Sequence, residues 1–347
     1  MSPFILTALI SSLGLGTAIT FSSSHWLLAW MGLEINTLAI LPIMSKNHHP
    51  RAVEATTKYF ITQATAAAMI LFASTTNAWA TGQWDIQQLT LPVSASMATF
   101  ALALKLGLAP VHFWLPEVLQ GLDLVTGLIL STWQKLAPFA LLLQMAHISP
   151  TITTVLGLSS MLVGGWGGLN QTQLRKILAY SSIAHLGWMV IIIKFDPFLT
   201  LLSLGLYIIM TTSAFMTLNS NNSTTMNSLA TSWSNAPALT AFFPLIVLSL
   251  GGLPPLSGFM PKWLILQELT KQQLPLLASI SALSALISLY FYLRLSYAMT
   301  LTSSPTTTTT STSWRLPTKK TTFPLAVAVS CSTLLLPLTP TIQAILY

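Results

Sequence analysis

The chain has 347 residues, of which 53% are hydrophobic and only 6% are charged, whereas about a quarter of an average soluble domain is charged. Most of the chain therefore cannot face water, and a soluble enzyme is excluded. The single cysteine, Cys331, excludes a disulfide framework and a thiolate metal or iron–sulfur site, since these need several cysteines. In a membrane protein, a net charge of +7 is expected to set the orientation in the membrane and the contacts with lipid. No nucleic-acid binding is expected.

Apolar stretches separated by polar or Pro/Gly-rich breaks predict eleven membrane-spanning segments, and hence an all-α polytopic membrane protein. The polar connections from Ser220 to Ala236 and from Met299 to Thr322 are predicted to be surface loops. The predicted spans cover residues 3–21, 25–45, 58–80, 92–118, 123–146, 149–169, 173–194, 197–219, 237–271, 274–297 and 323–345.

The basic residues are distributed unequally between the two faces that eleven spans define. Nine of the 14 Lys and Arg residues fall on the face of the N-terminus, whereas only Lys194 and Lys271 fall on the other face. By the positive-inside rule, this asymmetry predicts an N-terminus on the cytoplasmic or matrix side and a C-terminus on the opposite side. The remaining three, Lys105, Lys135 and Lys262, lie inside apolar spans.

These three lysines and one acid are the candidate functional residues. A lysine near the bilayer centre costs roughly 2.5 to 3.5 kcal/mol on insertion scales. Lys105 and Lys135 lie almost at the midpoints of spans four and five, and Glu34 lies close to the midpoint of span two. Each alone could snorkel or be neutralised by a hydrogen bond, and for Lys262, nearer one end of its span, snorkelling is a stronger alternative. Glu34, Lys105 and Lys135 share one depth, and together they predict a function more strongly than any of them alone.

Spans four and nine are also broken by proline. Pro110 frees the carbonyl of Leu106, and Pro254 frees that of Leu250, because proline has no N–H to donate. Exposed backbone at membrane depth is tolerated only inside protein or along a water-filled cavity. Broken helices beside buried charges therefore indicate an ion path.

The two breaks align at an offset of 145 residues, with Gly107 opposite Gly252. Since five spans separate them, the chain is predicted to form two five-helix repeats of inverted topology, as in many secondary transporters. The predicted domains are residues 1–147, residues 148–298, and residues 299–347 with a polar loop and the last span.

Further polar groups could extend the path. Pro138 frees a carbonyl beside Lys135. His112 and Glu117 follow the Pro110 break, where Glu117 either extends the polar track or caps a helix end. One turn of span seven could hold a short water chain or simply provide interhelical hydrogen bonds. Its polar residues are Ser181, Ser182 and His185.

Three segments, residues 26–37, 105–117 and 251–259, carry a specific resemblance. They read WLLAWMGLEINT, KLGLAPVHFWLPE and GGLPPLSGF, and they resemble the vertebrate, mitochondrially encoded NADH-ubiquinone oxidoreductase chain 2 family, along the whole chain. The resemblance implies an antiporter-like subunit of the membrane arm of respiratory complex I, in the mitochondrial inner membrane. There, electron transfer from NADH to ubiquinone would drive proton translocation.

The resemblance also implies roles for the buried charges. Glu34 would pair with Lys105 in one half-channel, Lys135 would be the central lysine, and Lys262 would lead to the other half-channel or exit. NADH and ubiquinone would be used by the complex, while this chain itself is expected to bind no cofactor and no metal, since no Gly-rich phosphate loop follows a strand. The expected partners are other membrane-arm subunits, in an obligate hetero-oligomer, and membrane lipids.

Two other functions would use the same residues. A stand-alone cation/proton antiporter would run on an ion gradient rather than on redox chemistry. A structural spacer would use its buried charges only to bind neighbouring helices.

Overall fold

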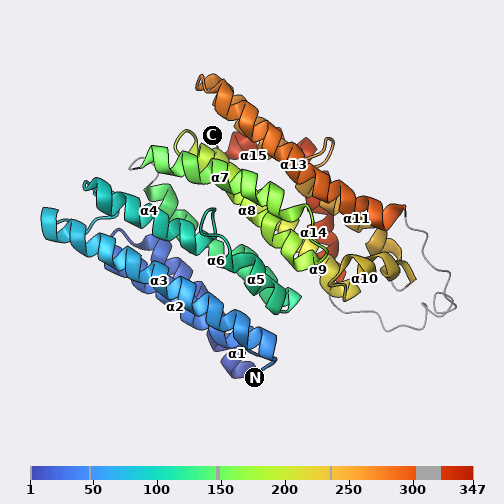
Figure 1. The fold of residues 1–347 in the computed structure, drawn as a ribbon, viewed down its shortest axis with the longest axis horizontal. Coiled ribbons are helices and arrows are strands. Elements are labelled where there is room, and N and C mark those ends of the chain that lie inside the picture. The colour runs from blue at the N-terminus through green and yellow to red at the C-terminus, as the bar shows by residue number, and fades with distance from the viewer. Residues whose placement is uncertain (1, 47, 146–148, 235–236, 302–321, 347) are drawn as a thin grey trace. The chain divides into compact units, whose positions relative to one another are not determined.

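The computed structural model describes residues 2–46, 48–145, 149–234, 237–301 and 322–346. In these ranges the regular structure is helical, which confirms the predicted all-α class (Figure 1). The chain divides into two compact units, Met1–Ser160 (unit 1) and Met161–Tyr347 (unit 2). The domain boundaries at residues 147 and 298 stay predictions.

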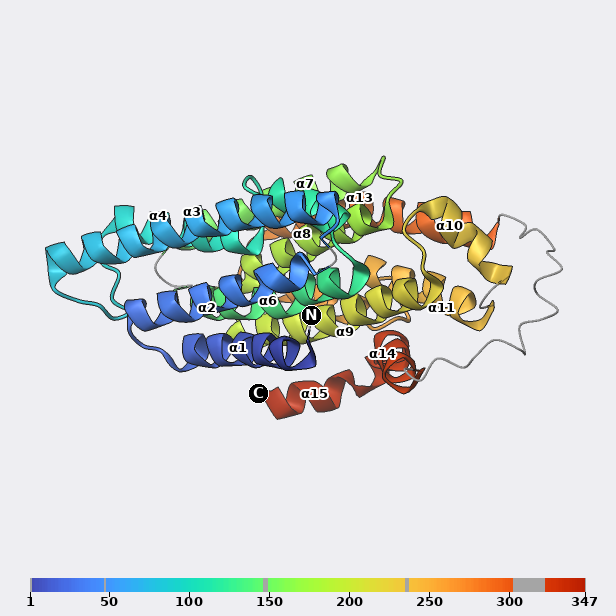
Figure 2. The ribbon, with the colours of Figure 1, turned by 90° about the horizontal axis from the view of Figure 1, so that it is seen from below.

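The described part of unit 1 contains six complete helices, and the boundary between the units falls within a seventh. Helices α1 and α2 pack against each other, as do α3 and α4 (Figure 2). The helices are α1 (Pro3–Ser22), α2 (Trp26–Met44), α3 (Pro50–Thr81), α4 (Pro92–Leu106), α5 (Trp114–Gly121), α6 (Leu124–Gln144) and α7 (Pro150–Gly168).

Unit 2 continues with helices that pack mainly around α9, which contacts α8, α11, α12 and α14. Its elements are α8 (Leu174–Ile192), α9 (Pro197–Asn221), α10 (Met226–Ala230), η1 (Thr231–Ser234), α11 (Pro237–Gly251), α12 (Phe259–Lys271), α13 (Pro275–Thr300), α14 (Thr322–Leu334), η3 (Leu336–Leu338) and α15 (Thr339–Leu346).

Proline sets many of the helix starts. At the first helical position its missing N–H is one that the helix leaves unpaired anyway, and its fixed φ suits the helix. In the described part of the chain, seven helices begin in this way, at Pro3, Pro50, Pro92, Pro150, Pro197, Pro237 and Pro275.

The two units repeat the same order of elements. Three helices (α1 to α3, and again α7 to α9) are followed by a broken helix (α4 and α5, or α11 and α12) and then by one more helix (α6 or α13), with the short α10 and η1 inserted before the second broken helix. An isolated antiparallel bridge joins His25, before α2, to Asp85, between α3 and α4, and a second joins Gln173, before α8, to Thr225, between α9 and α11. This repetition agrees with the repeat inferred from the two proline breaks.

Several helices are suited to crossing a membrane. Of the described helices, α1, α2, α6, α9 and α13 are each long and apolar enough, and the bent pair of α14 and α15 would make a sixth. Helices α4 and α11 are apolar but have only 15 residues each, because the predicted breaks end them. Large side chains such as Phe4 and Trp79, which are 84% and 91% exposed, would then face lipid.

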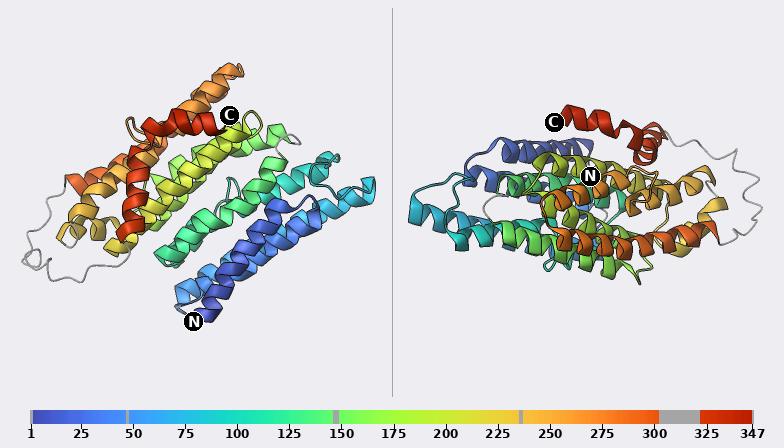
Figure 3. Two further views of the ribbon diagram at one scale, coloured as in Figure 1. Left: turned by 180° about the vertical axis from the view of Figure 1, so that it is seen from behind. Right: turned by 90° about the horizontal axis from the view of Figure 1, so that it is seen from above.

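Three features of the described chain differ from the prediction by more than a few residues or in shape. Helix α3 begins at Pro50, eight residues before the predicted span, and part of the loop predicted after Ser220 forms α10, started by a capping box between Thr225 and Ser228. The last span bends by 69° between α14 and α15, where Pro337 cannot continue an α-helix (Figure 3). Most of the second predicted loop lies outside the described residues.

Candidate functional site

Two of the predicted lysines line one small cavity in unit 1. Lys105, in the last turn of α4, is 6% exposed, and Lys135, in the middle of α6, is 3% exposed. The cavity has a volume of about 20 Å³, which is about the space that one water molecule requires. Its wall also carries amide and hydroxyl groups that can hydrogen-bond water, from Asn36, Thr37, Gln63 and Gln134.

Lys105 lies beside this cavity with its ammonium group unbonded among the described residues. The Lys105 Nζ is buried and makes no hydrogen bond with any described residue. A buried ammonium without hydrogen bonds is strongly unfavourable. Lys105 lines the polar, water-sized cavity, so the cavity and the charge belong to one site.

Glu34 belongs to the same site. Its half-buried carboxylate accepts a hydrogen bond from Thr37, with 3.1 Å between Thr37 Oγ1 and Glu34 Oε2. It acts electrostatically on both Lys105 and Tyr59, and these two residues line the cavity together with Thr37. The structure therefore places the acid within electrostatic reach of Lys105, and Lys105 and Lys135 beside one cavity.

Close packing and one hydrogen bond hold α2 in this position. A Cβ added to Gly32 would come within 2.8 Å of the Gly16 carbonyl, so the crossing of α1 and α2 requires glycine. On the other side, Gln134 Nε2 of α6 donates to the Asn36 carbonyl at 3.2 Å. This bond ties α6, the helix of Lys135, to α2, the helix that carries Glu34.

The break in unit 1 lies directly after Lys105. Helix α4 ends at Leu106 and is followed by its C-cap Gly107, whose φ of 78° is left-handed and therefore favours glycine. The Trp114 indole N–H, from the first turn of α5, donates to the Leu104 carbonyl at 3.0 Å. His112 is buried within the break, but among the described residues of unit 1 the cavity wall does not include it.

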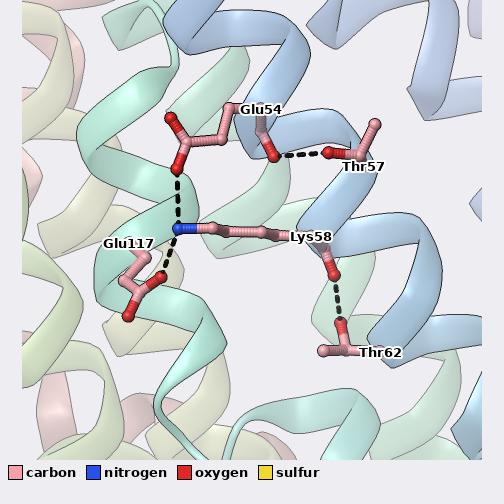
Figure 4. Close-up of polar contacts among 5 residues, drawn as sticks. All are labelled: Glu54, Thr57, Lys58, Thr62 and Glu117. Atoms are coloured by element: carbon pink, nitrogen blue, oxygen red, sulfur yellow. Dashed lines mark hydrogen bonds and ion pairs between the residues drawn. The ribbon is translucent and has the colours of Figure 1, made fainter.

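Glu117 forms an ion pair across two helices. Figure 4 shows Lys58 of α3 between two carboxylates, with its Nζ 2.7 Å from Glu117 Oε2 of α5 and 2.8 Å from Glu54 Oε1. All three side chains are more than 40% exposed. The sequence left open whether Glu117 extends the polar track or caps a helix end. The structure favours neither, because the Glu117 carboxylate ties α5 to α3.

The break in unit 2 is built around Lys262. Gly252 follows α11 with a φ of 77°, and the half-buried Lys262 of α12 donates from Nζ to the Gly251 carbonyl at 2.7 Å and to the Leu250 carbonyl at 3.4 Å. The carbonyl that Pro254 was predicted to free is thus bound by the predicted lysine. The carbonyl end of α11 also attracts the ammonium charge.

The polar turn of α8 is buried in unit 2. The hydroxyls of Ser181 and Ser182 donate to carbonyls of their own helix, and both side chains are at most 1% exposed. His185 lies with its ring 5.8 Å from that of Tyr207, centroid to centroid. Tyr207 of α9 and Tyr292 of α13, both buried beside these serines, were not identified from sequence, because an isolated tyrosine in an apolar span resembles a core aromatic.

In the described ranges, no three His, Cys, Asp or Glu side chains gather closely enough to hold a metal ion.

Comparisons with known proteins agree over the whole chain. A family model described as NADH:quinone oxidoreductase/Mrp antiporter matches residues 23–288, and one described as NADH dehydrogenase subunit 2 C-terminus matches residues 289–343. The NADH-ubiquinone oxidoreductase chain 2 of Oncorhynchus mykiss is 69% identical over 347 residues, covering 100% of this chain and 99% of the relative. The chain belongs to the NADH-ubiquinone oxidoreductase chain 2 family. The protein of the same name from Gadus morhua is also 69% identical, over 346 residues, with 100% and 99% covered.

Solved structures extend this likeness to the fold. A chain of respiratory complex I from Thermus thermophilus aligns with a TM-score of 0.86 and 29% identity, over 100% of this chain and 80% of that one. A chain of the Mrp complex from Dietzia shares the fold, with a TM-score of 0.83 at 17% identity, over 97% and 75%. The predicted family, fold class and role as a membrane subunit of complex I are confirmed.

Proposed function

We propose that this chain translocates protons as part of complex I, with Glu34, Lys105 and Lys135 forming the exchanging groups of unit 1 and Lys262 that of unit 2. Electron transfer from NADH to ubiquinone, carried out by the complex, would supply the energy. The observation that carries this proposal is the water-sized cavity that Lys105 and Lys135 line together.

The cavity supports proton exchange because of what surrounds it. A proton can pass from one lysine ammonium to a second lysine in its neutral amine form only if an exchangeable group or water lies between them, and the cavity wall carries such groups. The Glu34 carboxylate, joined to the wall through Thr37, can stabilise a proton on Lys105 or release that stabilisation if it moves. One unit thus contains an acceptor, a donor and an electrostatic control.

Unit 2 supports the same function with a different arrangement. Lys262 holds the end of α11 through two carbonyls, and His185 lies in the buried polar turn of α8. Both groups can carry a proton. Lys262 would therefore serve the second half-channel or the exit, and His185, Ser181 and Ser182 would serve the path that leads to it.

The location follows from the family and the charge count. We infer the mitochondrial inner membrane, with the N-terminus and the nine basic residues of its face in the matrix and the C-terminus in the intermembrane space. The other membrane-arm subunits would cover those apolar faces that lipid does not.

Lys135→Arg tests the proposal in the assembled complex, reconstituted into liposomes. Arginine keeps the charge but is effectively never deprotonated, so the complex should assemble while the number of protons moved per electron falls. Lys271→Arg, on an exposed lysine at the end of α12, is the matched control and should leave this ratio unchanged. A normal ratio in the Lys135→Arg complex would show that Lys135 does not carry the proton.

Glu34→Gln tests the electrostatic control. The amide keeps the volume and some hydrogen bonding but cannot change the charge state of Lys105, so coupled NADH oxidation should slow more than assembly declines. Wild-type pumping and turnover in this variant would make the pair structural. Proton exchange by the purified chain alone in liposomes would instead support a stand-alone antiporter.

A further inference from the structure

Gln63 of α3 is a buried polar side chain of unit 1. It is 4% exposed and lines the same cavity as Lys105. The buried residues of the next two turns of α3, Ala66, Ala67 and Ile70, are all apolar. Gln63 therefore places an amide on a stretch of helix that otherwise only packs against its neighbours.

Gln134 of α6, which lines the same cavity, shows what a structural glutamine does there. Its Nε2 donates to the Asn36 carbonyl at 3.2 Å and so joins two helices. The Gln63 Nε2, by contrast, is buried and donates to no described residue. A buried amide donor without an acceptor is unfavourable. Gln63 therefore requires a partner other than the helices that surround it.

Two donors of one cavity wall share this requirement. The Lys105 Nζ is also buried without a hydrogen bond to any described residue, and an ammonium group can only donate. Both donors need an acceptor, and the cavity volume of about 20 Å³ suits one water molecule. A water oxygen can accept from both, whereas a metal cation accepts from neither and is repelled by the ammonium.

The wall also carries an acceptor for the hydrogens of such a water. The Thr37 hydroxyl donates to Glu34, at 2.8 Å to the backbone carbonyl and 3.1 Å to Oε2, so its oxygen can still accept. The two donors and this hydroxyl would give one water about the number of partners that a buried water ordinarily has. Asn36 also has an unbonded buried amide, but its Oδ1 packs on Gly16, at the crossing of α1 and α2.

We propose that Gln63 is a positioning residue for Lys105, and that it acts through one water molecule bound by both side chains. The water satisfies the ammonium group and orients it within the cavity, while Gln63 itself neither gains nor loses a proton. This inference rests on the proposed function, because it concerns the solvation of a lysine through which unit 1 exchanges protons.

The first test is Gln63→Met in the assembled complex, reconstituted into liposomes. Methionine is also long and unbranched but has no amide, and no hydrogen bond between the described helices is lost, so assembly should be unchanged. Coupled NADH oxidation should slow several-fold. Its further slowing in D₂O should exceed that of the wild type, because proton transfer from Lys105 becomes more rate-limiting. A glutamine that only fills space would not change this isotope effect.

The matched control is Thr65→Val, which removes an exposed hydroxyl from the same helix. This hydroxyl bonds only within α3, to the Thr62 carbonyl at 2.8 Å. Thr65→Val should therefore leave the rate and the isotope effect at their wild-type values.

A second measurement does not depend on any variant. An electron cryo-microscopy map of the wild-type complex that resolves ordered water should show one water within about 3 Å of both the Gln63 amide and the Lys105 Nζ. The same water should be missing from the map of Gln63→Met. A wild-type cavity without water, or a water that contacts Lys105 but not Gln63, would overturn the inference even if Gln63→Met assembled poorly.

Lys135→Arg, the test of the proposed function, keeps the two failures distinct. If it lowers the number of protons moved per electron while Gln63→Met matches Thr65→Val in rate and isotope effect, the role of Gln63 is wrong and the proposed function stands. If Lys135→Arg leaves that number unchanged, the proposed function fails, whereas the map still decides whether Gln63 and Lys105 share a water.

Discussion

The two broken helices share a backbone geometry but bind their exposed carbonyls with different side chains. In unit 1 a neutral indole, that of Trp114, caps the Leu104 carbonyl, and Lys105 is left to face the cavity. In unit 2 the lysine itself, Lys262, caps the carbonyls at the end of α11. The charge on Lys105 is therefore separate from the stability of its break, whereas the charge on Lys262 is part of it.

Removing the lysine at each break should have the largest effect on turnover. The two variants should differ in assembly, and this difference distinguishes the two breaks. Lys105→Met and Lys262→Met should each lower coupled turnover roughly 10²-fold, the lower range for a positioned proton-transfer group. Only Lys262→Met should also reduce the amount of assembled complex, because it leaves two carbonyls without their donor, at a cost of about 1 to 3 kcal/mol. Native gels and NADH oxidation per assembled complex measure the two quantities. Equal assembly of the two variants would contradict the comparison.

Substituting the glycine at each break should have the next largest effect. Alanine in the left-handed region costs about 1 to 2 kcal/mol, which applies to both Gly107→Ala and Gly252→Ala. The new Cβ would lie 2.8 Å from Lys262 Cδ at Gly252, but no closer than 3.3 Å to Leu115 Cδ1 at Gly107. Gly252→Ala should therefore lower the thermal inactivation temperature of the complex more than Gly107→Ala does.

The matched control for the glycine pair is Gly14→Ala in α1, where an added Cβ meets nothing within 4 Å. It should leave the inactivation temperature near that of the wild type. If Gly107→Ala were the more damaging of the two break variants, the tighter coupling of the second break to its lysine would be refuted.

Trp114→Phe should have a smaller and local effect. It removes the indole donor to the Leu104 carbonyl, which keeps only the 3.2 Å hydrogen bond from the Gly107 N–H, so the loss should cost about 1 kcal/mol, while Lys105 keeps its charge. Backbone amides of residues 107–113 should exchange faster with deuterium, as measured by mass spectrometry, with coupled turnover nearly normal. Trp79→Phe, at a side chain that is 91% exposed, provides the control. Unchanged exchange would mean that the indole does not hold the break.

The ion pair of Lys58 with Glu117 should matter least. Its side chains are 43% and 53% exposed, and exposed pairs are screened by water and salt. Glu117→Gln should leave assembly and turnover unchanged at ordinary ionic strength, and so should Glu54→Gln, which removes the other carboxylate paired with Lys58. A clear loss of pumping in Glu117→Gln would instead place this carboxylate on the proton path.

The candidate residues and the positions of the breaks could be predicted from the sequence because both signals are local. A charge in an apolar span is conspicuous, since the membrane penalises it whatever its neighbours are. Proline removes a backbone donor at its own position, so Pro110 and Pro254 mark breaks without any knowledge of packing. Proline also lies at the start of many helices, because the N–H that it lacks would be unpaired at that position anyway.

The groups that each lysine contacts were decided only by the tertiary structure. The Trp114 cap on Leu104, the Lys262 bonds to Gly251 and Leu250, and the pair of Lys58 with Glu117 join residues 10 to 59 positions apart. Tyr207 and Tyr292 meet the serines of α8 from two other helices. Such contacts depend on the rotation and approach of separate helices, which hydrophobic pattern does not specify when nearly every face is apolar. Sequence therefore determined which polar groups enter the membrane, and packing determined their partners.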